Sequence, residues 1–519
     1  MIEQLALLPG FLTAHLQLSL VALALGTLIS VPLGILVTRR RELEPGVLGV
    51  ASVIQTIPSL ALLAIMVPTL AAIGAFTARV FGIEIRSIGY LPAIVALTLY
   101  SVLPILRNTV AGIQGVAPAL VEAARGVGMT PSQQLRRVEL PLALPVIVAG
   151  LRTATVWVVG TATLSTPVGA TSLGNFIFSG LQTRNFNAVL VGCIASAGLA
   201  IVLDQTIRLL EVGLRERHRG RVVAAAAVLA VLSAWTVGSA ARSWLPADRA
   251  PLSIGAKTFT EQYVLSEILS QWLEARVGRS SQPVSSLGST VAFDALRTDE
   301  IDVYVDYSGT IWATIMKREG LPERREDVLE AVRAYLADEH GVEVVAALGF
   351  ENTYALGMAG DRARELGVTR ISDLPRVASR LAIGGDFEFF ARAEWKALEQ
   401  VYGLAFREQR TMDASLMYSA VETGDVDVIS AYSTDGRISA FGLSLLEDDR
   451  GVIPPYDAIV LASPRLVREE PQVIEALREL SGAIDAPRMR QLNHAVDGGG
   501  KSPRQAAAEF LADRTGSGN

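Results

Sequence analysis

Long apolar segments follow one another through the first half of the chain. Their lengths are close to the ~20 residues that an α-helix needs to cross a bilayer. They occur at about 14–37, 47–74, 90–114, 142–164, 186–210 and 222–240. The pattern predicts six membrane-spanning helices. The first segment follows acidic Glu3 rather than a basic stretch and is long for a signal peptide, so we expect it to remain as a span.

Arginines between these segments indicate how the spans are oriented. Residues 1–221 contain sixteen Arg, nine acidic residues and no Lys, a net charge of +7. Most of the Arg follow the first span or lie at the ends of the loops that join spans three to four and five to six. Only Arg79, Arg86 and Arg184 lie on the other side. Because positively charged loops stay in the cytoplasm, we expect the N-terminus and the chain after Arg242 to lie outside.

From residue 252 the pattern changes to short strand-like runs that alternate with helical ones. This alternation is typical of α/β domains with parallel sheets and crossover helices. The remaining chain is long enough for two lobes. The runs interpreted as strands are 252–254, 301–305, 342–347, 381–383, 426–429 and 459–461. Helices are predicted at 260–276, with Thr260 as N-cap, at 325–340 and at 415–423.

Composition and charge agree with a chain made of two different parts. Half of all residues are hydrophobic, 19% are charged and the net charge is −6. Because residues 1–221 carry +7, the rest of the chain carries −13, which is typical of a soluble acidic domain. We therefore predict a membrane domain at 1–221, a sixth span with its linker at 222–251, and a domain outside the membrane at 252–519.

Few residues indicate reaction chemistry. The single cysteine, Cys193, provides no disulfide framework. The sequence contains no zinc-spaced Cys/His cluster, catalytic triad or nucleophile elbow, so it favours a non-enzymatic protein with no cofactor, no metal site and no nucleic-acid partner. Residues 495–502 fit a relaxed phosphate-loop pattern, but a polar stretch precedes them and Pro503 follows. A true phosphate loop follows a buried strand, so we expect a loop before the last helix.

Two charged residues fall inside predicted spans. Arg152 lies in the fourth span and Asp204 in the fifth. An intramembrane charge is often functional, but Arg152 is only two to three turns from the cytoplasmic end, where an arginine can reach the interface or form a pair. Asp204 is the candidate partner.

The segment 118–141, between spans three and four, combines small residues with a terminal Leu-Pro pair. Small side chains allow a partner to approach closely, and Pro is tolerated in the first turn of the following helix. The pattern resembles the coupling loop of ABC-importer permeases. That resemblance implies an all-α permease of the type I importer kind with six spans, a separate ABC ATPase subunit docked on the loop, and a permease homodimer. The coupling residues it implies are Glu122, Ala123, Ala124, Gly128, Leu140 and Pro141.

A series of short motifs runs through the second half in a fixed order. The motifs are 254–262, 302–310, 350–356, 389–392, 431–437 and 454–457. The series resembles the binding-protein family for glycine betaine, choline, carnitine and related quaternary amines. The resemblance implies a two-lobed α/β domain of the periplasmic binding-protein kind, here fused to its own permease.

The same resemblance implies where a ligand would bind. A quaternary ammonium group has no N–H to donate, and aromatic faces hold it by cation–π attraction, at roughly 0.5–2 kcal/mol per contact. The positions that match the family's cage are Tyr307, Tyr354, Tyr432 and Tyr456. The positions that match its carboxylate-binding groups are Lys257, Thr310 and Arg392. Tyr304 would face away from Tyr307 on a strand, so we expect it in the core.

These features together predict ATP-driven import of a quaternary amine such as glycine betaine, choline or carnitine across a bacterial or archaeal cytoplasmic membrane. This chain would supply both the pathway and the tethered receptor. Two alternatives remain: an importer for another betaine such as ergothioneine, and a membrane receptor that senses a quaternary amine without transporting it.

Overall fold

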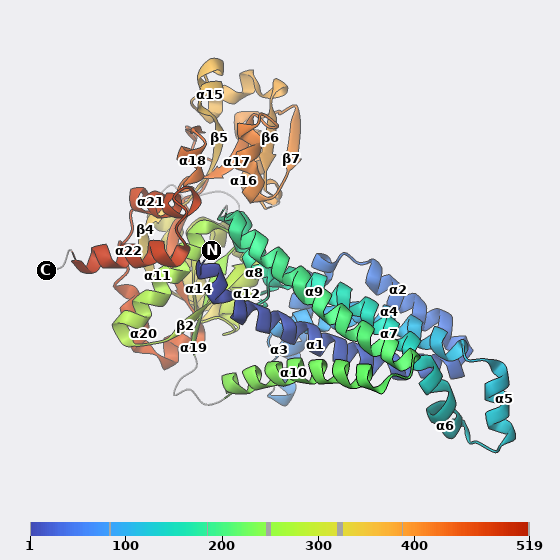
Figure 1. The fold of residues 1–519 in the computed structure, drawn as a ribbon. Helices are drawn as coiled ribbons and strands as arrows, with labels where there is room; N and C mark the ends of the chain where they lie inside the picture. The colour runs from blue at the N-terminus through green and yellow to red at the C-terminus, as the bar shows by residue number, and fades with distance from the viewer. Residues whose placement is uncertain are drawn as a thin grey trace. The chain divides into compact units, whose positions relative to one another are not determined.

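The computed structural model describes residues 2–82, 85–183, 185–244, 251–318, 325–386 and 388–516. The chain divides into a helical unit, residues 1–178 and 187–249, and an α/β unit, residues 250–519, with which the short segment 179–186 is grouped (Figure 1). Arg184 and most of the predicted linker, at 245–250, lie outside the described residues.

The helical unit contains six described helices that are long and apolar enough to cross a membrane, which confirms the predicted number of spans. Helices α1, α4 and α7 contact one another. The long helices of the unit are α1 (Ile2–Arg39), α3 (Ser59–Phe81), α4 (Tyr90–Gln114), α7 (Leu140–Ala162), α9 (Phe186–Arg215) and α10 (Arg219–Trp244), and its shorter ones are α2 (Glu44–Thr56), α5 (Pro118–Gly126), α6 (Pro131–Gln134) and α8 (Gly174–Gln182).

The second predicted span, 47–74, is wrong as a single helix. Helix α2 ends at Thr56, and α3 begins at Ser59. Between them Ile57 is extended, with φ −67° and ψ 128°. Pro58 explains the break, because a proline disfavours the helical conformation in the residue before it. The apolar pattern continues through the break because α2 packs its Ala51 against α4.

The predicted ion pair of the helical unit is present. The Arg152 guanidinium on α7 contacts the Asp204 carboxylate on α9, with an Nε to Oδ1 distance of 2.5 Å. A second pair joins Arg39, at the end of α1, to Glu139, directly before α7. These two pairs connect helices that are far apart in the sequence.

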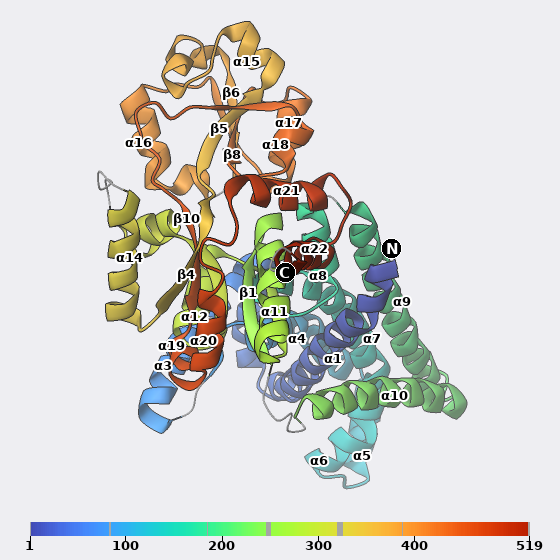
Figure 2. The same ribbon diagram turned by 90° about the vertical axis from the view of Figure 1, so that its left-hand side faces the viewer.

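The α/β unit contains two five-stranded sheets, one in each lobe (Figure 2). The first sheet has the order β2-β1-β3-β10-β4 and the second β7-β6-β8-β5-β9. The strands are β1 (Leu252–Lys257), β2 (Ser281–Leu287), β3 (Val303–Tyr307), β4 (Glu343–Glu351), β5 (Tyr354–Ala359), β6 (Ala382–Gly385), β7 (Glu408–Thr411), β8 (Val428–Tyr432), β9 (Leu443–Leu446) and β10 (Asp457–Ala462). The helices are α11 (Thr260–Val277), α12 (Ser289–Arg297), α13 (Ser308–Thr310), α14 (Arg325–His340), α15 (Gly360–Leu366), α16 (Ala393–Tyr402), α17 (Ala414–Glu422), α18 (Arg437–Ala440), α19 (Pro464–Glu469), α20 (Pro471–Arg478), α21 (Ala486–Asp497) and α22 (Pro503–Gly516).

The predicted parallel sheets are present only in part, because both sheets are mixed. Strand β1 is parallel to both β2 and β3, and β6 is parallel to both β7 and β8. In contrast, β10 is antiparallel to β3 and β4, and β5 is antiparallel to β8 and β9. The chain crosses between lobes from β4 to β5 and from β9 to β10. Strands β5 and β10, which the chain enters from the other lobe, are therefore antiparallel to both of their neighbours.

Each of the six predicted runs overlaps a described strand, but the runs at 301–305, 342–347, 381–383 and 426–429 begin one or two residues before the strand does, while α14 has the predicted bounds. The predicted N-cap is wrong by one residue. Phe259 is the N-cap of α11, and Thr260 is the first helical residue. The hydroxyl of Thr260 donates instead to Asp497 at 2.6 Å. The region 495–502 comprises the end of α21 and the loop before α22, as expected for a chain without a phosphate loop there.

Candidate functional site

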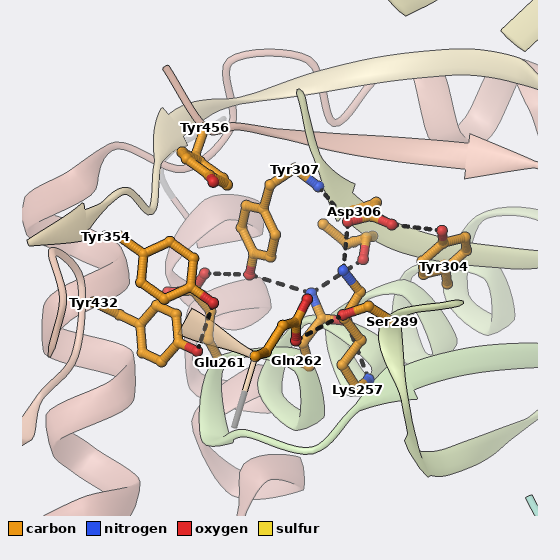
Figure 3. A network of polar contacts seen from close by, with 12 residues as sticks. Lys257, Glu261, Gln262, Ser289, Tyr304, Asp306, Tyr307, Tyr354, Tyr432 and Tyr456 are labelled. Carbon is orange, nitrogen blue, oxygen red and sulfur yellow. Dashed lines mark hydrogen bonds and ion pairs between the residues drawn. The ribbon is translucent and has the colours of Figure 1, made fainter. Parts of the chain in front are cut away.

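All seven residues predicted to bind ligand in the α/β unit line one cavity between the two lobes. The four tyrosines lie at strand ends: Tyr307 is the last residue of β3, Tyr354 the first of β5 and Tyr432 the last of β8, while Tyr456 directly precedes β10. Figure 3 shows these four rings arranged around a common space. The other lining residues are Lys257, Phe259, Ser289, Thr310, Asn352, Glu388 and Arg392.

The aromatic rings contact one another directly. Tyr354 and Tyr432 are register partners on the antiparallel strands β5 and β8, and their ring centroids are 4.9 Å apart. Tyr456 meets the Tyr354 ring edge-on at 5.8 Å. Phe259 is nearly parallel to Tyr432, with an interplanar angle of 7° and a centroid distance of 5.7 Å. The free volume of this cavity is about 30 Å³.

Three of the four tyrosine hydroxyls donate to buried or partly buried carboxylates. Tyr307 donates to Glu261 at 2.6 Å, and Tyr456 donates to Glu394 at 2.6 Å. Tyr432 donates to Asp386 at 3.1 Å. Burial raises the pKa values of these phenols well above their ordinary value, so each remains a neutral donor.

Where they are ionised, these carboxylates give the space around the rings a negative electrostatic potential, which attracts a cation. Burial also raises the pKa of Asp386, although the backbone N–H of Phe389 partly opposes this effect. Burial likewise raises the pKa of Glu261, which accepts from the Tyr307 hydroxyl, so the cavity wall combines aromatic faces with acidic groups whose neutral form is favoured by burial.

Lys257 has a partner within the protein. Its ammonium group forms an ion pair with Asp306 at 2.5 Å, and both side chains are almost completely buried. Asp306 also accepts a hydrogen bond from the Tyr304 hydroxyl at 2.6 Å. Tyr304 is fully buried, which confirms the prediction that it belongs to the core. Lys257 lies 5.6 Å from the centre of the Tyr307 ring, so its position is tied to one wall of the cage.

Arg392 lies between aromatic and acidic groups. Its guanidinium is 5.1 Å from the centre of the Tyr354 ring. It donates to Glu388 at 2.5 Å, to the Tyr456 hydroxyl at 3.3 Å and to Glu394 at 3.5 Å. Burial alone would raise the pKa of Glu388, but the positive charges of Arg392 and Lys257 outweigh this effect and lower it. Thr310, also buried, completes the predicted set.

Sequence reasoning missed several residues of this cavity. Phe259 has a recognisable signal, because it follows β1 and immediately precedes α11, and ligands of α/β folds lie beyond the carboxyl ends of strands. Asn352, between β4 and β5, has a similar position at a lobe crossing. Ser289 has no comparable signal, since only the tertiary fold brings it to this cavity. Glu388 lies four residues before Arg392 and pairs with it locally, so its place beside the guanidinium had a signal in the sequence.

The predicted coupling residues lie in the helical unit. Glu122, Ala123 and Ala124 are on α5, where Ala124 is buried. Gly128 follows with φ +80°, a left-handed conformation that favours glycine. Its neighbour Val127 is 74% exposed to solvent. Leu140 and Pro141 start α7, as the sequence predicts.

Glu139 anchors the C-terminal end of this coupling segment. The residue is 3% exposed. Both of its carboxylate oxygens accept hydrogen bonds from Arg39, and one also accepts from Gln134 on α6. Gln134 in turn accepts from Arg125 on α5. The two short helices are thus connected to the ends of α1 and α7.

Comparison with known proteins agrees with this division. Residues 250–513 match the family described as the substrate binding domain of ABC-type glycine betaine transport system, and residues 30–216 match the binding-protein-dependent transport system inner membrane component. The ergothioneine transport permease/ergothioneine binding protein EgtU of Helicobacter pylori (strain G27) is 30% identical over 480 residues, which are 89% of this chain and 82% of that protein.

Two further relatives each match one half of the chain. The choline transport system permease protein OpuBB of Bacillus subtilis (strain 168) is 44% identical over 197 residues, 38% of this chain and 83% of that protein. The carnitine transport binding protein OpuCC of Listeria monocytogenes is 31% identical over 264 residues, 50% of this chain and 85% of that protein. The chain therefore belongs to the ABC-type binding-protein-dependent transport family, as an inner membrane component joined to a substrate-binding domain of the glycine betaine type.

Proposed function

We propose that this chain takes up a quaternary amine of the glycine betaine, choline and carnitine class, using ATP hydrolysis by a separate ABC ATPase subunit. The observation that carries the proposal is the convergence of Tyr307, Tyr354, Tyr432 and Tyr456 on one interlobe cavity. A quaternary ammonium cannot donate a hydrogen bond, so aromatic faces are its best partners. The carboxylates behind three of these rings add to the attraction.

Arg392 is the residue best suited to hold a ligand carboxylate, because a guanidinium can donate two parallel hydrogen bonds. Its bonds to Glu388 and Glu394 would have to be shared with the ligand or exchanged. Lys257 is already paired with Asp306. Its proposed contribution is therefore positive potential and the placement of Tyr307, with Thr310 providing a hydroxyl nearby.

Coupling to ATP hydrolysis is assigned to segment 118–141. Exposed Val127 and the small residues around it suit a groove on the ATPase. Two ATPase subunits must close around ATP, so the permease part would be a homodimer with two-fold symmetry. The arginine distribution supports a cytoplasmic position for this segment and an outside position for the α/β unit. Attachment to the permease raises the local concentration of the receptor at the pathway.

Two other candidates have specific support. The similarity to EgtU supports a larger betaine such as ergothioneine, which also carries a quaternary nitrogen. A sensing receptor would use the same cage, but it has no need for a segment that docks an ATPase. The coupling-loop pattern at 118–141 therefore favours transport over sensing.

The test is uptake by proteoliposomes that contain the full chain and its partner ATPase. Radiolabelled glycine betaine, choline and carnitine are supplied outside, with ATP inside. The proposal predicts accumulation that depends on ATP and is competed by other quaternary amines. A chain that binds these amines but never accumulates them, with an active ATPase present, would favour the receptor instead.

A further inference from the structure

A second cavity of about 500 Å³ adjoins the aromatic cage. Ser289, Glu388 and Arg392 line both spaces, so the two are adjacent at these side chains. One wall of the larger groove comes from the start of α12 and from residues 313–317 of the first lobe. The opposite wall comes from residues 388–394 of the second lobe.

Two buried polar atoms beside this groove have no hydrogen-bond partner among the described residues. One is Nε of Arg392, a donor, and the other is Oε2 of Glu394, an acceptor. The two residues are 8% and 6% exposed. An unpaired buried polar group destabilises the folded protein, and such groups are uncommon in native proteins. A ligand that offers an acceptor and a donor would satisfy both.

The other carboxylate oxygen of Glu394, Oε1, already accepts two hydrogen bonds. Oε1 accepts from the Tyr456 hydroxyl at 2.6 Å and from Arg392 at 3.5 Å. These bonds fix the carboxylate at the junction of cage and groove. The remaining oxygen, Oε2, is available to accept a hydrogen bond, for which the described residues supply no donor.

The opposite wall of the groove supplies donors instead. Helix α12 starts at Ser289, and its N-cap, Gly288, provides no side-chain cap. The first N–H groups of a helix have no partner within the helix and favour a negative charge. Lys317, whose side chain is exposed, also lines this groove. The groove thus has donors on the first lobe, and the second lobe contributes the unpaired acceptor.

We propose that this groove is a second ligand subsite, in which Glu394 accepts a hydrogen bond from an O–H or N–H group on the ligand's substituent. The inference rests on the proposed function, because the cage must hold the quaternary nitrogen. The preferred ligand is then a betaine that carries a hydroxyl group or a ring N–H as well as a carboxylate. Glycine betaine carries no donor at all, so it leaves Oε2 unpaired and fills little of the groove.

The test compares two ligands that differ by one hydroxyl group, carnitine and its deoxy analogue γ-butyrobetaine. Calorimetry uses the full chain in lipid nanodiscs. One hydrogen bond to a buried acceptor predicts that carnitine binds about tenfold more tightly. In Glu394→Gln, the amide oxygen keeps the bonds of Oε1 and the NH₂ group faces the ligand donor. The preference should then fall below about threefold.

Glu388→Gln is the matched control, because Glu388 lies on the same wall and also pairs with Arg392, but its oxygens already have partners. It should change the affinity for both ligands while keeping their ratio. Equal affinity of the wild-type chain for the two ligands would overturn the subsite without affecting the cage. Absence of binding by any quaternary amine would instead overturn the proposed function. The wild-type ratio needs no variant, so a folding failure of Glu394→Gln leaves the test decisive.

Discussion

The helical and α/β units each bury a glutamate, and the two are used differently. Glu139 is 3% exposed, and both of its oxygens accept hydrogen bonds from residues that connect α1 and α6 to the start of α7. Glu394 is 6% exposed and leaves one oxygen unpaired beside a cavity. Burial alone therefore does not identify a binding residue. The two glutamates differ in their hydrogen bonds, and the unpaired oxygen of Glu394 is the one that we propose a ligand would use.

The largest expected effect is a loss of uptake, which depends on the helical unit, without any change in ligand affinity, which depends on the α/β unit. Gly128→Asp introduces a charge and a side chain at a position with φ +80° on the coupling segment. ATP-driven uptake should be abolished, while ligand affinity measured by calorimetry stays unchanged, because the cage lies in the other unit. Gly128→Asn is the control, since Asn tolerates the left-handed conformation and adds no charge. Normal uptake by a well-expressed Gly128→Asp chain would show that the segment does not dock as proposed.

The next effect concerns Arg392. Arg392→Ala should weaken binding of a carboxylate ligand such as glycine betaine by about 2–5 kcal/mol, the range for removing one partner of a buried charge pair. Choline has no carboxylate and should lose much less. Arg392→Lys retains the charge but not the planar fork, so its loss should be intermediate. If Arg392→Ala weakens both ligands equally, the residue acts through the packing of Glu388, Glu394 and Tyr354.

The comparison of the two glutamates predicts opposite readouts for the same substitution. Glu139→Gln removes the charge that pairs with Arg39, so it should destabilise the chain by about 1–3 kcal/mol, seen as a lower thermal unfolding midpoint. It should not alter the carnitine preference. Glu394→Gln should alter that preference with little change in the midpoint. The same readout for both variants would remove the distinction.

A smaller effect tests the cage walls. Tyr432→Phe keeps the aromatic face and loses the hydroxyl that donates to Asp386, so binding should weaken by about 1 kcal/mol or less. Tyr432→Ala removes the face and should cost about 1–3 kcal/mol. The same order should hold at Tyr307, Tyr354 and Tyr456. Equal tolerance of Phe and Ala at all four positions would contradict a cation–π cage.

The smallest effect is the dependence of affinity on pH. Burial raises the pKa of Asp386, so its negative charge is lost at a higher pH than that of a free aspartate, about 3.9. A cationic ligand prefers the ionised form, and affinity should therefore weaken severalfold as pH falls through the raised pKa. Glu388, whose pKa is lowered, stays ionised over the same range. Calorimetry on Asp386→Asn should show a flatter profile; an unchanged slope would assign the effect to another group.

Much of the fold could be predicted because each signal was local. Apolar length alone located the spans, and the period of residues 325–340 gave both ends of α14. Prediction was wrong where the tertiary path decided the structure. The antiparallel direction of β10 depends on the lobe from which the chain arrives. The break at Pro58 was hidden because α2 remains apolar where it packs on α4.

The residues of the site also differ in whether a local sequence signal identifies them. The four tyrosines and Arg392 were found because each sits in a short motif at a strand or helix end. Phe259 could have been added by the same reasoning. Glu394 could not, because its significance lies in one oxygen that Tyr456 and Arg392 leave free, and these three residues meet only in the folded chain. The ion pair of Lys257 with Asp306 was equally invisible, since it joins two strands.

The most direct test of the cage compares trimethylammonium ligands with their dimethylammonium analogues, glycine betaine with dimethylglycine and choline with dimethylaminoethanol. Calorimetry on the full chain measures both pairs. The N–H of each dimethyl analogue loses its water without gaining an acceptor among aromatic faces. Each quaternary ligand should therefore bind about tenfold or more tightly than its analogue. Tighter binding of the dimethyl analogues in both pairs would contradict recognition of a quaternary amine by these tyrosines.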